Sequence, residues 1–291
     1  MKQIAIYTAI VGDYDDIHQP LVVDERFDYI LFSNDITEKQ IGVWQIRPIP
    51  YHNDIQTKIA RWVKTHPDKL LSDYMATLWM DANIQIVTPY TYTQCQKLLE
   101  NHIDIASIIH PERDSIYEEI TCCICEGIES ERIAITWMQK IRKNHYPLHN
   151  GLHETNVLYR INKDPLMAEF NRQWWSIIDK YSKRDQFSFD YVLWRLHFKC
   201  DSFLSEGFNS RNSNDFRYII SSTHKSQRQV SSTSHPFYYW FTKAHLSRSF
   251  WNYGEWLTHF YYKISNIFPP ILALYIASMP YKLKVFLLRH K

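Results

Sequence analysis

The stretch from Met75 to Val87 places the strongest constraint on what this chain can fold into. Apolar and β-compatible residues lead into Asp81, and an extended apolar pattern resumes after Asn83. So continuous an apolar run predicts a strand that is buried on both faces of a sheet. Open α/β sheets bind their ligands at the ends of such strands. We therefore expect Asp81 to lie at a ligand site.

Asp81 and Asn83 offer a carboxylate and an amide oxygen two residues apart. Such oxygen ligands suit Mg²⁺ or Mn²⁺ that is also held by the phosphates of a substrate. The alternative is a plain turn after a strand, because both residue types favour turns. This pattern alone leaves both interpretations open.

Strands and helices alternate through the rest of residues 1–210, which predicts an α/β fold. The chain has neither the three glycines of a dinucleotide fingerprint nor a Gly-Lys-Ser/Thr loop. With six glycines in all, we expect a metal ion and side chains to meet the charge of a diphosphate. The expected strands are 4–11, 27–32, 44–49, 75–81, 103–109 and 156–161, and the expected helices are 53–65, 89–101, 116–127, 130–144, 165–181 and 187–198.

Three cations, Lys58, Arg61 and Lys64, recur at three-residue spacing on the first predicted helix, so they share one face. Arg and Lys are natural phosphate partners, and we predict that Lys58 and Arg61 assist at a diphosphate. The alternative is an ordinary solvated basic face.

Further candidates lie at a strand end, in a polar loop and at a helix start. His110 ends a predicted strand as Asp81 does, and it is either a ligand or a structural hydrogen-bonding group. The loop 146–154 holds Asn150 and Glu154, and polar loops on α/β scaffolds recognise substrates, although surface positions would also explain them. Asp185 lies at the start of a predicted helix. It is a simple N-cap, a general base or a carboxylate that stabilises a positively charged sugar transition state.

The charge is distributed unevenly along the chain. Residues 211–291 hold 11 Lys/Arg and 2 Asp/Glu, whereas residues 1–210 hold 22 and 29. This asymmetry argues against a general nucleic-acid binder and predicts two parts, a domain at 1–210 and a basic, aromatic linker and helical tail at 211–291. The tail either lies on an anionic membrane surface or packs as a helical arm on protein.

The five cysteines form no paired framework, which fits reduced thiols in the cytosol. A strand follows Met1 almost directly, so we expect no signal peptide. The longest apolar stretch, 267–279, is too short to span a bilayer comfortably. We expect a cytoplasmic protein that is peripheral on the inner membrane face.

Several motifs together resemble a known family. They are collinear over residues 4–205 and comprise Tyr7-Thr-Ala-Ile-Val-Gly-Asp-Tyr-Asp15, Trp79-Met-Asp-Ala-Asn-Ile84, His110-Pro-x-Arg113-x-x-x-Tyr117-Glu-Glu119, Gly151-Leu-x-Glu154 and Arg184-Asp-Gln-x-Ser-Phe189. The chain resembles the glycosyltransferase-like family that includes plant mucilage-linked hexosyltransferase candidates and a plant protein described as an alkaline ceramidase.

The resemblance implies a GT-A-like fold, with a Rossmann-type mixed sheet flanked by helices. It also implies the transfer of a hexose from a nucleotide-sugar donor to a glycan or lipid-linked acceptor. Asp81 and Asn83 would take the place of the family's metal-holding Asp-x-Asp element, with an amide as the departure. Tyr14 and Asp35 would line the base and ribose. The sugar and acceptor would be faced by His110, Arg113, Asn150, Glu154 and Asp185. Asp185 and Glu154 would be the catalytic carboxylates, and Asp185 is the first choice for the acid/base group if the reaction inverts the sugar.

Two other functions remain open. A metal-dependent lipid amidase would match the ceramidase description, but it usually needs three protein ligands, and the chain has no His-x-x-x-His pair. A non-catalytic sugar-nucleotide or glycan-binding scaffold is compatible with a single metal carboxylate.

Overall fold

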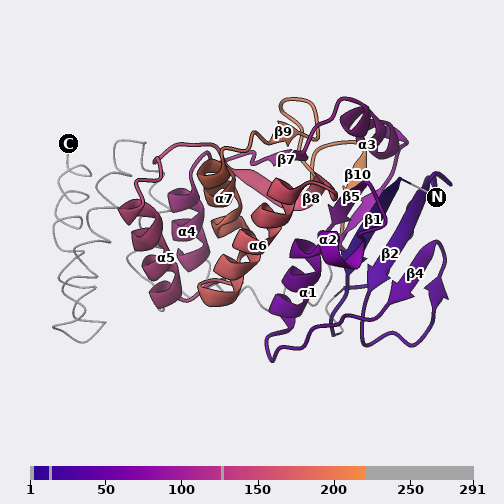
Figure 1. Ribbon diagram of the computed structural model, residues 1–291, viewed down its shortest axis with the longest axis horizontal. Coiled ribbons are helices and arrows are strands. Elements are labelled where there is room, and N and C mark those ends of the chain that lie inside the picture. Colours follow the sequence, from indigo (N-terminus) through magenta and orange to yellow (C-terminus); the bar gives the residue numbers. More distant parts are fainter. Residues whose placement is uncertain (1–2, 13–14, 126–127, 220–291) are drawn as a thin grey trace, which may run out of the picture. The chain divides into compact units, whose positions relative to one another are not determined.

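The computed structural model describes residues 3–12, 15–125 and 128–219 (Figure 1). Tyr14 and the tail at 220–291 lie outside the described residues. The chain divides into two compact units, one comprising 1–116 and 148–227 and the other 117–147 and 228–291. The described residues of the second unit are 117–125 and 128–147. They comprise most of α4 (Ile116–Cys125) and all of α5 (Glu131–Lys143), whose start is capped by Ser130.

The first unit is built on an eight-stranded mixed sheet in the order β3-β4-β2-β1-β5-β8-β7-β9. Its strands are β1 Ile4–Ala9, β2 Phe27–Phe32, β3 Gln40–Ile41, β4 Trp44–Arg47, β5 Ala76–Met80, β7 Ile105–Ile109, β8 His153–Ile161 and β9 Asp201–Ser202. A separate antiparallel pair joins β6 (Ile84–Ile86) to β10 (Phe216–Tyr218).

The direction of the strands confirms the predicted α/β class with a mixed sheet. β1 pairs in parallel with β2 on one side and with β5 on the other, and β8 runs antiparallel to both β5 and β7. The chain therefore leaves β1 toward one edge of the sheet and later returns to its other side. This reversal of strand order is where open α/β sheets form ligand crevices.

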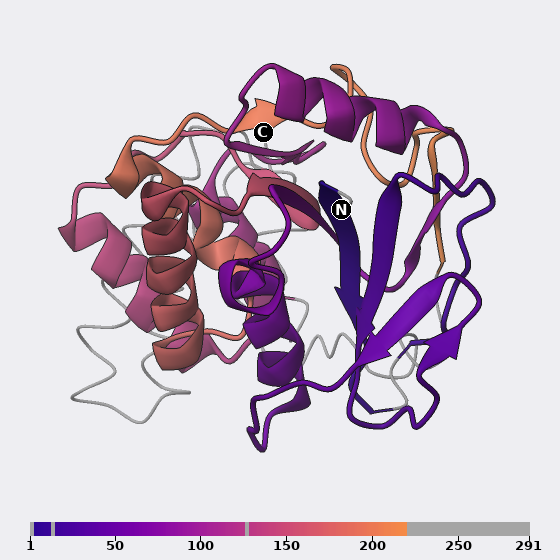
Figure 2. The same cartoon turned by 45° about the vertical axis from the view of Figure 1, so that its right-hand side comes forward.

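Helices cover both faces of the sheet. Figures 1 and 2 show α3 on one face and α1 and α6 on the other. The helices of this unit are α1 Gln56–Thr65, α2 Pro67–Leu70, α3 Tyr90–Glu100, α6 Pro165–Lys180 and α7 Phe189–Leu196, and the 3-10 turn η1 (Asp185–Phe187) precedes α7.

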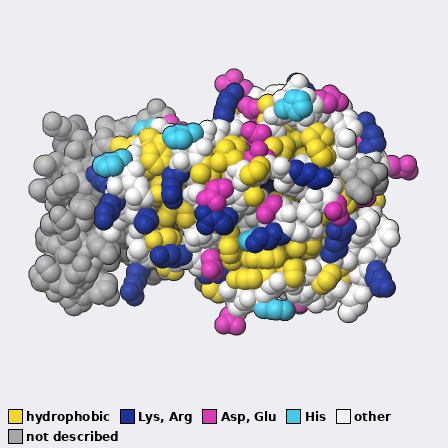
Figure 3. Space-filling model, in the orientation of Figure 1, with side chains coloured by type: hydrophobic (Ala, Val, Ile, Leu, Met, Phe, Trp, Pro, Cys, Tyr) yellow, Lys and Arg dark blue, Asp and Glu magenta, His cyan; other side chains and the backbone are white. Residues whose placement is uncertain are grey.

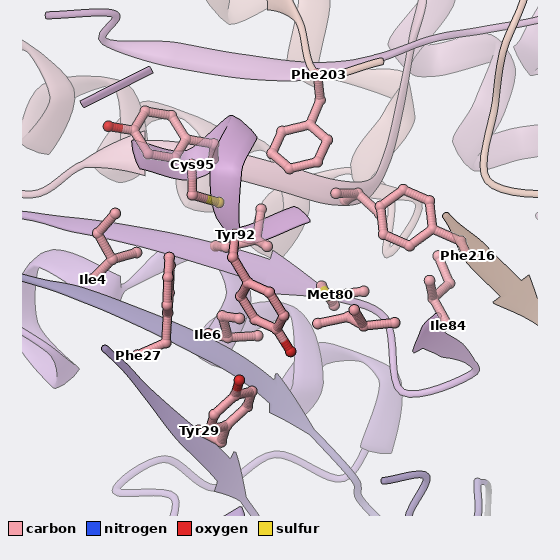
Figure 4. Packing of buried hydrophobic residues seen from close by; sticks show 14 of the residues in the cluster. Ile4, Ile6, Phe27, Tyr29, Met80, Ile84, Tyr92, Cys95, Phe203 and Phe216 are labelled. Atoms are coloured by element: carbon pink, nitrogen blue, oxygen red, sulfur yellow. The ribbon is translucent and has the colours of Figure 1, made fainter. Parts of the chain in front are cut away.

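The buried core beneath α3 is drawn in Figure 4. Ile4 and Ile6 of β1 pack there with Tyr92 and Cys95 of α3. The next residue, Tyr7, faces the opposite layer, where its hydroxyl donates to the Lys64 carbonyl of α1 at 2.9 Å. Burial of large apolar side chains stabilises a fold by about 1.5–3 kcal/mol each. The strand ends that carry the site are therefore held by packing on both faces.

The structure departs from the predicted elements at several places, and three of them affect the site. β8 begins at His153 instead of 156, because residues 153 and 154 pair with β7 beyond a register shift after Ser107. The predicted helix 187–198 is shorter and follows η1. Residues 211–219, expected to begin the linker, contain β10.

Within the described residues, no helix has both the length and the apolar character needed to cross a bilayer.

Candidate active site

Asp81 follows β5 at the centre of the sheet, directly beside β1. The Asp81 N–H donates to the Asn156 carbonyl at 2.8 Å, and the Ile84 N–H donates to the Asp81 carbonyl at 2.9 Å. The Asn83 carbonyl accepts from the N–H of Ile219 at 2.8 Å. Backbone hydrogen bonds from both sides therefore fix the turn that carries Asp81 and Asn83.

The carboxylate of Asp81 is 29% exposed and already has three partners. The Trp79 Nε1–H donates to its Oδ1 at 2.6 Å. Lys64 Nζ lies 3.5 Å from Oδ1, and Arg61 Nη1 lies 3.8 Å from it. Oδ1 is the nearest carboxylate oxygen in each contact, so the partners converge on one side of the group.

Asp185 is the second acid in this place and is almost completely buried. Its Oδ2 lies 2.5 Å from Lys64 Nζ, and its Oδ1 lies 3.3 Å from Arg61 Nε. Thr155 Oγ1 donates to Oδ2 at 2.8 Å and accepts from Lys64 at 3.0 Å. The Trp174 Nε1–H donates to the Asp185 carbonyl at 3.0 Å. We call Arg61, Lys64, Asp81 and Asp185 the charge cluster.

Burial and charge oppose each other in the charge cluster. Burial by itself raises the pKa of the Asp185 carboxyl, but Arg61 and Lys64 outweigh it and hold this pKa well below its usual range. Burial lowers the pKa of the Lys64 ammonium, against the pull of Asp185 and Asp81. Two cations and two anions thus balance. More generally, charges of both signs are intermixed on the face shown in Figure 3.

A narrow cleft, with an enclosed volume of only about 20 Å³, lies at the same end of β1 and β5. Asp81, Asp16 and His18 contribute polar groups to it, and Trp44 contributes an aromatic wall. Thr8 Oγ1 and Gln85 Oε1 also belong to cleft residues and are buried without a hydrogen-bond partner among the described residues. Unsatisfied buried polar groups are costly, so a ligand or solvent in the cleft would supply their partners.

The donor atoms at this place fit a hard divalent cation. Asp81 supplies a partly exposed carboxylate, and the Asn83 side chain has no hydrogen-bond partner within the described part of the chain. Oxygen ligands of this kind, completed by phosphate oxygens, are what Mg²⁺ and Mn²⁺ take. Asp81 and Asn83 could therefore hold such an ion.

A second network surrounds Glu154, which is buried on β8. Its Oε1 forms an ion pair with Arg211, and its Oε2 accepts from Ser210 Oγ at 3.3 Å. Asn156 Nδ2 donates to the same Ser210 Oγ at 2.8 Å, which links this network to the backbone that holds Asp81. The Arg211 guanidinium lies over the Tyr218 ring at 5.0 Å.

The shared face predicted for the three cations of α1 is only partly realised. Arg61 and Lys64 both reach Asp81 and Asp185. Lys58 instead bonds to α6, where its Nζ lies 2.5 Å from the Asp179 carbonyl and 3.2 Å from Asp179 Oδ1.

The other predicted site residues occupy local structure. Asp35 Oδ2 accepts from the Gly12 N–H at 2.6 Å, at a turn where Gly12 has a φ of +66°. His110 Nδ1 accepts from the Arg113 N–H at 3.0 Å, and Arg113 Nη2 lies 3.1 Å from His110 Nε2. Asn150 is exposed, and Tyr14 lies outside the described residues.

Sequence reasoning missed several groups that the fold brings to these networks. Thr155, Asn156 and Arg211 carry no motif that would mark them, because each acts through partners distant in sequence. The three-residue spacing from Arg61 marked Lys64 as a candidate, but nothing in the sequence indicated that Lys64 is buried.

The mixed sheet, the acid-amide turn at its switch point and the adjoining cleft are features of a glycosyltransferase-like α/β domain. The chain belongs to the TOD1/MUCI70 glycosyltransferase-like domain family, whose model matches residues 1–219. This membership confirms the resemblance drawn from the sequence motifs.

One similar solved structure is the WbbM bifunctional glycosyltransferase in its apo form, with 10% sequence identity and a TM-score of 0.42. The match covers 78% of this chain and 44% of that one, so this chain spans less than half of the WbbM structure. No curated protein sequence matches the chain.

Proposed function

We propose that this protein transfers a hexose from a nucleotide-sugar donor to a glycan or lipid-linked acceptor, assisted by Mn²⁺ or Mg²⁺. The observation that carries the proposal is the position of Asp81. It lies at the switch point of the sheet, lines the cleft and stands within 4 Å of two cations. Family membership supports the general class, and the specific donor and acceptor are our inference.

In this proposal the donor binds across the open mouth of the cleft with its diphosphate at Asp81. Asp81 and Asn83 hold the divalent ion, which supplies Lewis-acid stabilisation of the leaving phosphate when bound. Arg61, 16% exposed, adds positive charge beside it. Lys58 can bind the diphosphate only if its ion pair with Asp179 breaks. Tyr14 and Asp35 are proposed to line the base and ribose.

The two buried carboxylates receive different roles. Asp185 remains ionised because its pKa is depressed, which makes it a weak proton acceptor near neutral pH. Of the roles predicted for it, the proposal therefore favours a fixed negative charge that steadies a positive sugar transition state and holds Arg61 and Lys64. Glu154 is proposed as the acid/base group, with His110, Arg113 and Asn150 facing the sugar and acceptor.

The test is to incubate the purified protein with Mn²⁺ and a panel of nucleotide sugars and to measure released nucleoside diphosphate. Release that is lost in Asp81→Ala supports transfer. Glu169→Gln is the matched control, because it removes an acid of similar exposure whose ion pair with Arg172 lies in solvent. Release that persists in Asp81→Ala would contradict the proposal.

A non-catalytic sugar-nucleotide or glycan-binding scaffold is the second candidate, and one observation favours it. The carboxylate of Asp81 is already neutralised by Lys64 and Arg61, as in a site that holds a ligand without reacting. Binding of a nucleotide sugar without any turnover would select this function. Fatty-acid release from a ceramide would instead select the lipid amidase.

For the tail, we propose a cytoplasmic protein that is peripheral on the membrane through the basic residues after 219. Flotation of the full chain with anionic liposomes tests this, compared with a variant carrying Lys282→Gln, Lys284→Gln and Arg289→Gln. Equal flotation of the two proteins would refute the electrostatic membrane role.

A further inference from the structure

We propose that Lys64 and Arg61 are resident counter-cations of Asp81, which make tight binding of a divalent metal conditional on the nucleotide diphosphate. This inference rests on the proposed function and assigns an order to the ligands of the same site. It predicts that the metal ion and the nucleotide bind as a coupled pair.

The first step of the argument is that Lys64 cannot move away from Asp81. Its side chain is completely buried, and its Nζ is held by Asp185 at 2.5 Å and by Thr155 at 3.0 Å. Its backbone carbonyl accepts from the Tyr7 hydroxyl at 2.9 Å and from Arg160 Nη2 at 2.5 Å. The ammonium is therefore a fixed charge 3.5 Å from Asp81 Oδ1.

The second step is that Asp185, the acid that neutralises Lys64, is not free to bind a metal ion. Asp185 is engaged by Lys64, Arg61 and Thr155, and it is 3% exposed, so it is unavailable as a second metal ligand. Asn83 is neutral. A divalent ion arriving alone would meet a charge cluster whose two cations and two anions already balance, and Lys64 and Arg61 would repel it.

The third step is that a diphosphate supplies the missing negative charge. Its oxygens would complete the coordination of the ion and would also attract Arg61, which is partly exposed at 16%. Each ligand then improves the site for the other. Thermodynamic linkage requires the two effects to be equal, so the metal must strengthen nucleotide binding by the same factor.

The experiment is calorimetric titration of the intact protein with MnCl₂ alone and with MnCl₂ in the presence of UDP or GDP, corrected for the metal–nucleotide complex in free solution. We expect the affinity for Mn²⁺ to rise at least about tenfold with the diphosphate, within the range of about 5–150-fold that is typical of coupling between two sites. Titration of the nucleotide with and without Mn²⁺ should give the same factor.

Variants test the assigned residues. Arg61→Gln and Lys64→Met should each tighten the binding of Mn²⁺ alone and reduce the coupling factor. Lys69→Met is the matched control, because it removes an exposed cation from the neighbouring helix α2. Arg61→Gln keeps the test valid if Lys64→Met fails to fold, since Arg61 is the more exposed of the two.

The outcomes separate this inference from the proposed function. Equally tight Mn²⁺ binding with and without nucleotide, or unchanged coupling in Arg61→Gln, would overturn the inference while transfer activity stands. Failure of every nucleotide and nucleotide sugar to bind under any metal condition would overturn both. A coupling factor that falls in Arg61→Gln and is unchanged in Lys69→Met supports the inference about Lys64 and Arg61.

Discussion

Lys64 Nζ and Asp185 Oδ2 lie 2.5 Å apart in the protein interior, although 121 residues separate them in the chain. The ion pair joins the last turn of α1 to η1, and Thr155 of β8 bonds to both members. Neither partner can be solvated when the other is removed, because Lys64 is 0% and Asp185 is 3% exposed. The pair therefore ties the assembly of the site to the packing of three distant elements.

The first prediction concerns the stability of this pair. Lys64→Met leaves a buried carboxylate with less compensation and should lower the free energy of unfolding by about 3–5 kcal/mol. Lys64→Met combined with Asp185→Leu should recover part of this loss, because no buried acid remains uncompensated. Urea unfolding followed by circular dichroism measures both. A double variant as unstable as the sum of its single variants would show that the two residues are not coupled.

The second prediction concerns Asp81. Asp81→Asn keeps the shape of the side chain but removes its charge, so the release of nucleoside diphosphate should fall by about 10²–10³, as for loss of one electrostatic group in an active site. Because Asp81 is partly exposed, the melting temperature of the variant protein should change little. Activity and melting temperature measured on the same preparation check this. An inactive protein that also melts much earlier would indicate a structural role instead.

The third prediction concerns pH. His153 Nδ1 lies 2.5 Å from Asp190 Oδ1. Burial lowers the pKa of His153, but Asp190 outweighs it and raises the pKa to about 11. Because the native pKa lies above the unfolded value of about 6.5, the contribution of His153 is complete below pH 6.5 and is lost as pH rises toward 11.

Wild-type protein should therefore lose stability relative to His153→Gln between about pH 6.5 and 11, by up to about 1.4 kcal/mol per pH unit. Urea unfolding of the two proteins at a series of pH values measures this difference. His52→Gln, at an exposed position, is the control. A difference that stays constant over this range would mean that His153 is not charged in the folded protein.

The fold was predictable because its signals are local. The apolar run before Asp81, the first strand and the helices after Pro89 and Pro165 all form close to where the patterns place them. The position of Asp81 at a switch point followed from that run, because the carboxyl end of a buried strand is where α/β sheets collect ligands.

The interior partners of the site were less predictable. Lys64 and Asp185 carry charges, and sequence statistics place such residues on the surface unless a partner is known. Arg211 fell in a segment that composition assigns to a linker, yet it bonds to Glu154. Long-range ion pairs depend on which elements become neighbours, and no local pattern encodes that.

The fourth prediction concerns Arg160, which is buried and holds Lys64 in place. Its Nη1 donates to Asn171 Oδ1 at 2.6 Å, while its Nη2 donates to the Tyr7 hydroxyl at 2.6 Å and to the Lys64 carbonyl at 2.5 Å. Arg160→Lys cannot reproduce this planar fork, and each partner left unsatisfied costs about 1–3 kcal/mol.

Chemical denaturation should show Arg160→Lys to be less stable than wild type, with Mn²⁺–nucleotide binding weakened as Lys64 shifts. Arg172→Lys, on the exposed face of α6, is the control, because its ion pair with Glu169 lies in solvent. A lysine variant as stable as wild type would mean that the three acceptors are satisfied in another way.

The hydrogen bond from Ile219 to Asn83 has a further implication for how the protein handles large acceptors. The segment after Ile219 therefore begins beside the loop of Asp81 and Asn83, which is proposed to bind the sugar donor. A partner bound by residues 220–291 would thus be tethered near the site of transfer. Its effective concentration there would depend on the length of the linker between residue 219 and the partner. Changing the number of residues after 219 should tune transfer to tethered acceptors while leaving small, freely diffusing acceptors unaffected.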